Sequence, residues 1–194
     1  MANLFRKKET QQLSQRQMLA TKYYSARHNI LLVLVFTLVN IILLVTNSNT
    51  YFLFSASIPY FLVDLGMFLC GKYPAEYYTG ELAGMEILND TFFIVALVVA
   101  AVIMLLYLLS WIFSKKPRVG WMIFALVFFV IDTLGMLYLM DISTDALIDI
   151  VFHGWVIVSL TNGIISYFKA KKLPEEEELP EPQCEPAEEV QQVD

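Results

Sequence analysis

The stretch that decides the fold runs from Trp121 to Lys169. It reads WMIFALVFFVIDTLGMLYLM, then DISTDALID, then IVFHGWVIVSLTNGIISYFK. Two apolar runs, each long enough to cross a bilayer, are separated by a short acidic turn. Each run carries one ionisable side chain in its interior, Asp132 in the first and His153 in the second. The stretch therefore predicts a hairpin of two transmembrane helices with a polar pair inside the membrane.

Two further apolar runs precede this hairpin, at residues 30–46 and 91–113, and the second of them contains no charged residue. A third stretch, YFLFSASIPYFLVDLGMFLC at residues 51–70, is also long enough to span. It contains Pro59 and Asp64, and these indicate a broken or kinked backbone rather than a regular spanning helix.

The basic residues predict the topology. Twelve of the 13 lysines and arginines lie in three clusters, before the first run, at 115–118 and at 169–172. Four spans place all three clusters on one face, which the positive-inside rule makes cytoplasmic, whereas five spans would separate them. We therefore expect a multi-pass protein of the cell membrane, with both termini cytoplasmic and with residues 51–70 as a re-entrant or interfacial segment on the outer side. Such a segment must pack into the bundle, because lipid cannot satisfy exposed backbone amides.

Composition supports this assignment. The chain is 57% hydrophobic and 16% charged, whereas a soluble domain carries about 25% charged residues. The net charge of −6 comes from the tail, since residues 173–194 hold nine of the 19 acidic residues, four prolines and no base. The tail is predicted to be disordered, with a possible cytoplasmic protein partner.

The sequence thus predicts an all-α integral membrane bundle of four transmembrane helices plus one re-entrant or interfacial segment. The predicted divisions are a basic cytoplasmic arm at 1–29, a transmembrane domain at 30–172 (spans of about 30–46, 91–113, 120–140 and 147–168, re-entrant or interfacial segment 51–70, outer loop 71–90) and the acidic cytoplasmic tail at 173–194.

Four polar residues form the candidate intramembrane site. From the predicted helix ends and a rise of 1.5 Å per residue, Asp132 lies about 12 Å and His153 about 9 Å below the outer surface. Asn40 lies at a similar depth in the first run, and Asp64 lies in the segment at 51–70. In one interpretation Asp132 pairs with His153, Asn40 or a threonine hydroxyl and locks the bundle. In the other, the pair takes up and releases a proton or cation during transport.

Signatures of catalysis and cofactor binding are missing from the sequence. It contains no P-loop, dinucleotide fingerprint, nucleophile elbow, HExxH or paired CxxC motif. Asp149 and His153 share one helix face, but no further ligands at metal-binding spacing accompany them. We expect no enzyme activity, no cofactor, no metal site and no nucleic-acid partner, and the lipid bilayer as the main contact.

The stretches FSASIPYFLVDLGMFLCGKYPAEYY and WIFSKKPRVGWMIFALVFFVIDTLGM resemble small multi-spanning bacterial membrane proteins of unassigned function. The resemblance implies a membrane fold in a bacterial cytoplasmic membrane and assigns no residue a role. The function predicted from the sequence is a non-enzymatic membrane subunit, scaffold or regulator. The alternative is a small transporter or ion pathway that uses Asp132 and His153.

Overall fold

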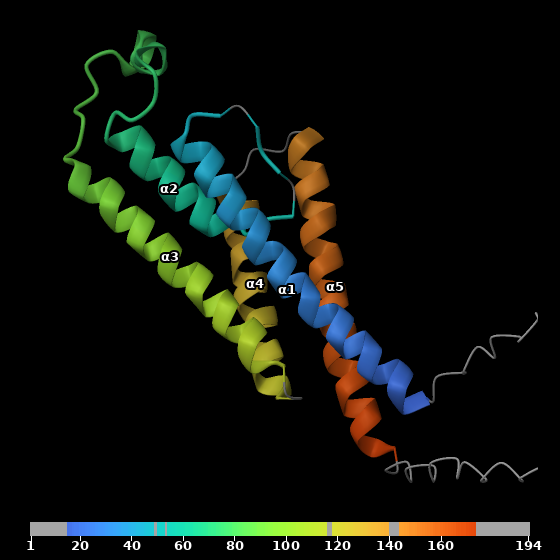
Figure 1. The fold of residues 1–194 in the computed structure, drawn as a ribbon. Helices are drawn as coiled ribbons and strands as arrows, with labels where there is room; N and C mark the ends of the chain where they lie inside the picture. The colour runs from blue at the N-terminus through green and yellow to red at the C-terminus, as the bar shows by residue number, and fades with distance from the viewer. Residues whose placement is uncertain (1–14, 49, 53, 116–117, 140–143, 174–194) are drawn as a thin grey trace, which may run out of the picture.

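The computed structural model describes residues 15–48, 50–52, 54–115, 118–139 and 144–173. Over these residues the regular structure is entirely helical (Figure 1), so the predicted all-α fold class is confirmed. Four of the five α-helices are long and apolar enough to cross a membrane. In chain order the elements are α1 (Gln15–Val45), α2 (Ser57–Leu69), the 3₁₀ turns η1 (Ala75–Tyr78) and η2 (Gly80–Leu82), α3 (Asp90–Phe113), α4 (Val119–Leu139) and α5 (Thr144–Lys172).

The first helix is longer than the predicted span at 30–46. It begins at Gln15, so residues 15–29 of the predicted basic arm form the first half of α1. Arg27 is the physical reason. Its side chain is only 7% exposed; its Nε donates to the Trp111 carbonyl at the end of α3 (2.9 Å), and its guanidinium lies 4.6 Å from the Trp111 ring centroid. A cation that meets a helix C-terminus and an aromatic face is stabilised by both, so this part of α1 can pack inside the bundle.

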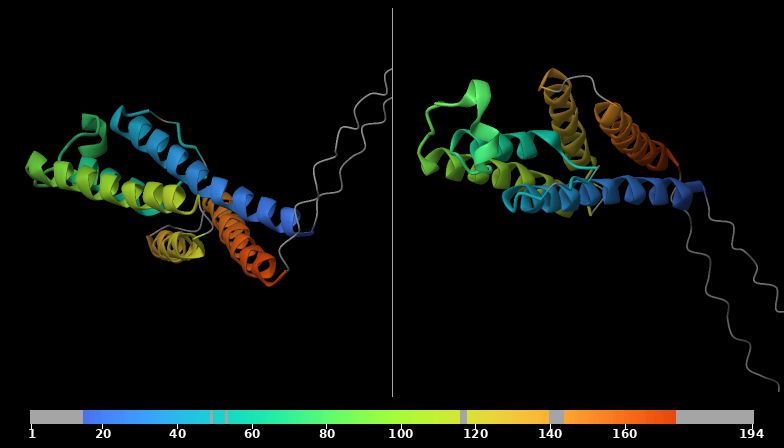
Figure 2. Two further views of the ribbon diagram at one scale, coloured as in Figure 1. Left: turned by 60° about the horizontal axis from the view of Figure 1, so that its bottom comes forward. Right: turned by 90° about the horizontal axis from the view of Figure 1, so that it is seen from above.

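Small residues allow the helices to approach closely. A Cβ added to Gly163 of α5 would lie 2.4 Å from the Cβ of Ala26 on α1, and one added to Gly66 of α2 would lie 3.0 Å from the Cβ of Ala96 on α3. Such contacts bring helix backbones together where apolar burial gives no advantage over lipid. They fix the two main pairings, α1 with α5 and α2 with α3, and Figures 1 and 2 both show α2 lying along α3.

The shortest helix, α2, has 13 residues, which gives a length of about 20 Å. A hydrocarbon core is about 30 Å thick, so α2 cannot cross it alone. It packs against α1, α3 and α4 instead. The predicted break in the segment 51–70 therefore lies before α2, in the irregular connection from Thr46 to Ala56.

The two ends of the bundle differ in charge. A hydrogen bond from the Tyr23 hydroxyl to the Ser114 carbonyl (3.1 Å) ties the first half of α1 to the end of α3. Figure 1 shows the start of α1, the end of α3, the start of α4 and the end of α5 at one end, called the basic end. The opposite end, called the loop end, carries the connections 46–56 and 70–89. Every described lysine and arginine except Lys72 lies on the segments that meet at the basic end: Arg16, Lys22, Arg27, Lys115, Arg118, Lys169, Lys171 and Lys172.

Some predictions fall outside the described residues. They are the first part of the basic arm (1–14), the acidic turn (140–143) and the acidic tail from residue 174 onward, with Cys184 in it.

Candidate functional site

The N-terminus of α2 is buried in the bundle, and Asp132 of α4 meets it there. One carboxylate oxygen accepts from the Ser57 N–H (2.9 Å) and the other accepts from the Ile58 N–H (2.8 Å). Asp132 is only 3% exposed. The residue before the helix is Ala56, which has no side chain that could cap it. Asp132 therefore caps α2 from another helix, and its negative charge lies at the positive end of the α2 dipole.

The other backbone groups of this first turn are also accounted for. The Ala56 N–H donates to Thr37 Oγ1 of α1 at 2.7 Å, and the Thr37 hydroxyl donates in turn to the Val33 carbonyl. Pro59 has no N–H to satisfy. A helix leaves four N–H groups without intrahelical partners at its start, and here two helices of the bundle and one proline account for all four.

Asn40 holds the connection that leads into α2. Its Oδ1 accepts from the Phe52 N–H (2.8 Å), and its Nδ2 donates to the Phe52 carbonyl (2.6 Å) and to Ser55 Oγ (2.9 Å). Phe54 in this connection has φ +78°, a conformation that costs free energy for a bulky side chain. Its ring packs edge-on against Phe152 of α5, with 4.1 Å between the centroids. Asn40 and this packing hold the strained connection in place.

His153 of α5 lies on the other side of Asp132. Its Nδ1 is 2.8 Å from the Asp149 carbonyl, which can only accept, so Nδ1 carries a hydrogen. Its Nε2 is 3.5 Å from Asp132 Oδ2, which is long for a hydrogen bond, and it has no hydrogen-bond partner among the described residues. The ring stacks on Phe129 and is 1% exposed. With Nδ1 protonated, Nε2 would turn a lone pair toward the carboxylate unless a second proton lies between them.

A further buried polar group of the bundle is Tyr107 of α3. Its hydroxyl has no hydrogen-bond partner among the described residues. The ring packs against Phe128 of α4 at 5.2 Å. The polar side chains of the site come from α1, α4 and α5, and its centre is the start of α2.

No family model, curated protein or solved structure matches this chain. Nor does the described part of the chain contain a group of three or more histidine, cysteine, aspartate or glutamate side chains placed to hold a metal ion.

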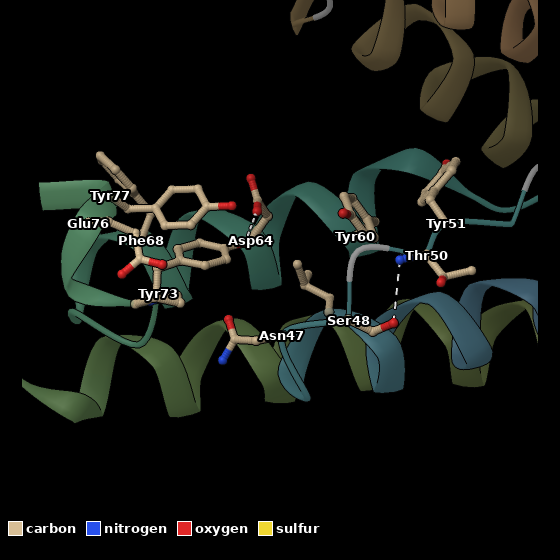
Figure 3. A pocket seen from close by; sticks show the side chains of 12 residues that line it. Asn47, Ser48, Thr50, Tyr51, Tyr60, Asp64, Phe68, Tyr73, Glu76 and Tyr77 are labelled. Atoms are coloured by element: carbon tan, nitrogen blue, oxygen red, sulfur yellow. Dashed lines mark hydrogen bonds between the residues drawn. The ribbon is translucent and has the colours of Figure 1, made fainter.

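Asp64, the fourth predicted site residue, lies elsewhere. It is seven residues further along α2 than Ser57, about 10 Å along the helix axis. Its carboxylate accepts from the Tyr73 hydroxyl and lines a cleft at the loop end (Figure 3). The structure thus gathers Asp132, His153 and Asn40 around residues 52–58 and leaves Asp64 out.

Sequence reasoning missed two participants, Thr37 and the backbone of α2. Thr37 looks like an ordinary polar residue within an apolar run, and no pattern distinguishes it. The start of α2 has no local side-chain cap because Ala56 precedes it, and this boundary is visible only in the structure.

Proposed function

We propose that the chain is a non-enzymatic multi-pass protein of the cell membrane, a subunit, scaffold or regulator, in which α2 is a re-entrant segment held in place by Asp132. The single observation that carries this proposal is the double hydrogen bond from the first turn of α2 to Asp132. Both carboxylate oxygens are committed to backbone N–H groups, and the side chain is 3% exposed. A buried charge satisfied in this way stabilises one arrangement of helices.

The orientation belongs to the same proposal. The basic end faces the cytoplasm under the positive-inside rule, and the loop end with α2 faces outward. Cys70, 5% exposed at the end of α2, then lies near the outer side, and Cys184 lies inside. The acidic residues of the tail are the proposed contact for a cytoplasmic protein.

One observation favours transport as a second candidate. His153 Nε2 faces Asp132 at 3.5 Å and has no hydrogen-bond partner among the described residues, an arrangement that suits a proton between the two groups. In this function the pair would take up and release a proton or cation.

Flux measurements separate the two functions. The purified protein is reconstituted into vesicles with a pH gradient or a monovalent-cation gradient, and wild type is compared with Asp132→Asn and with protein-free vesicles. We expect wild type to conduct no faster than protein-free vesicles. If wild type conducts protons or cations and a folded Asp132→Asn protein does not, transport would replace our proposal as the function.

A second experiment tests the partner. Mild crosslinking in native membranes, followed by purification, is done with the full chain and with a chain truncated after Lys172. We expect a cytoplasmic protein to co-purify with the full chain and to be lost with the tail. Equal recovery with both chains would show that the tail is not the contact.

A further inference from the structure

The cleft at the loop end has a volume of about 590 Å³ and opens between the end of α1, one face of α2 and the turn that contains η1 (Figure 3). This size lies within the range of small-molecule sites. It borders the site around Asp132, because the Tyr51 hydroxyl in its lining lies 3.0 Å from Ser55 Oγ, which accepts a hydrogen bond from Asn40. Its lining is formed by Leu44, Asn47, Ser48, Thr50, Tyr51, Tyr60, Asp64, Phe68, Tyr73, Pro74, Glu76 and Tyr77.

The charge in this cleft is negative. Asp64 and Glu76 line it, and none of the described lysines and arginines does. The nearest base in sequence, Lys72, pairs with Asp90 instead, at 2.7 Å. Asp64 receives a hydrogen bond from the Tyr73 hydroxyl, which orients the carboxylate. Burial and this hydrogen bond raise the pKa of Tyr73, so its phenol remains a neutral donor.

Aromatic rings flank Asp64 on both sides. Tyr73 and Tyr77 stack with their centroids 5.2 Å apart, and Tyr51 and Tyr60 meet edge-to-face at 5.1 Å. Figure 3 shows the Asp64 carboxylate between these two pairs. Burial raises the pKa of Tyr51 to about 12, so this ring too is uncharged at neutral pH. The faces of neutral aromatic rings attract cations, and a central carboxylate adds a counter-ion.

We propose that this cleft binds an organic ammonium cation, with Asp64 as the counter-ion and the Tyr73–Tyr77 and Tyr51–Tyr60 pairs as its walls. A calcium ion fits poorly, because it requires six to eight oxygen ligands, and the described residues contain no group of three or more histidine, cysteine, aspartate or glutamate side chains placed to hold a metal ion. An anion is disfavoured by two carboxylates without a base. The ammonium group could belong to a soluble amine or to the headgroup of a membrane lipid, since both present the same chemistry.

The binding test uses tetramethylammonium and choline as probes, by isothermal titration calorimetry on the full chain in an uncharged maltoside detergent. Dimethylbutanol, the uncharged carbon isostere of choline, is the matched ligand control. We expect saturable binding of both cations and none of the alcohol. Equal binding of the alcohol, or no saturable binding of either cation, would overturn the proposal.

Variants locate the site. Asp64→Asn should weaken binding about tenfold or more, the equivalent of one close charge contact. Tyr77→Leu changes a ring that is 52% exposed, so the fold should tolerate it, and it should weaken binding severalfold. Glu86→Gln removes an exposed carboxylate outside the cleft and should change nothing. Affinity unchanged in both cleft variants would place the binding elsewhere and refute the assignment.

Competition identifies the source of the ammonium group. Vesicles rich in phosphatidylcholine or phosphatidylethanolamine, and vesicles of phosphatidylglycerol, are added to protein loaded with tetramethylammonium. Displacement of the probe by phosphatidylcholine or phosphatidylethanolamine vesicles, but not by phosphatidylglycerol vesicles, would assign the site to a lipid headgroup. Retention of the probe with all three would assign it to a soluble amine. Displacement by phosphatidylglycerol equal to the others would contradict a site selective for ammonium.

Discussion

The substitution Asp132→Asn tests whether this carboxylate holds α2 in place. An asparagine can accept from only one of the two N–H groups at Ser57 and Ile58, because its Nδ2 is itself a donor. A buried N–H left without a partner costs about 1–3 kcal/mol. The lost charge at the helix N-terminus costs about 0.3–1 kcal/mol more. Relief of the buried charge offsets part of this, so we expect the free energy of unfolding to fall by about 2–3 kcal/mol.

The measurement has a global and a local part. Denaturant titration in detergent micelles, followed by circular dichroism, gives the free energy of unfolding. Cys70 reports on α2 directly, because it lies at the helix end, is 5% exposed, and its thiol donates to the Asn89 carbonyl. In a Cys184→Ser background, a loss of about 2 kcal/mol in the free energy that holds α2 in place should raise the rate at which a thiol reagent labels Cys70 about 30-fold.

Asp90→Asn is the matched control, since it makes the same chemical change at an exposed carboxylate that pairs with Lys72. Exposed ion pairs contribute about 0–1 kcal/mol, so this variant should stay close to wild type. If Asp132→Asn is as stable as Asp90→Asn and leaves Cys70 labelling unchanged, the carboxylate does not hold α2, and the reasoning from its two hydrogen bonds is refuted.

Three further predictions follow from the packing and topology. In a double-mutant cycle, the variant with both His153→Gln and Asp132→Asn should lose about 1 kcal/mol less free energy of unfolding than the sum of the two single losses. Strictly additive losses would show that the pair does not interact. Gly163→Ala should destabilise by about 1–3 kcal/mol, because its new Cβ would lie 2.4 Å from the facing helix, whereas Gly154→Ala has open space and should be neutral or stabilising by about 0.5–1 kcal/mol. Cys184 should not react with an impermeant thiol reagent in intact cells, and labelling before lysis would reverse the proposed orientation.

The sequence predicted the four long helices because each contains an apolar run of membrane length, which is a strong local signal. The first helix begins at residue 15, well before the predicted span, for a tertiary reason. Residues around Tyr23 and Arg27 read as a polar arm, since a chain segment with arginine and lysine is normally solvated. The end of α3 provides both the carbonyl that accepts from Arg27 and the ring beneath it, and that surface exists only after folding.

Three of the four predicted site residues lie together in the structure, but their connections were not predicted. Depth along the helices brought Asp132, His153 and Asn40 to one level, and the structure places all three around residues 52–58. The main partners of Asp132 are backbone N–H groups, and every residue carries those, so composition gave no signal for them. Depth also grouped Asp64 with the others, but α2 runs along α3 from its buried start and carries Asp64 toward the loop end.

The double hydrogen bond also limits how Asp132 could work in transport. A proton taken up by the carboxylate removes its charge and occupies a lone pair, so the acid can no longer accept both N–H groups of α2 with the same strength. A transport cycle through Asp132 would require α2 to leave its cap in one state, and Cys70 labelling would then depend on pH. A structural lock requires the cap to persist, with labelling independent of pH wherever the fold is stable.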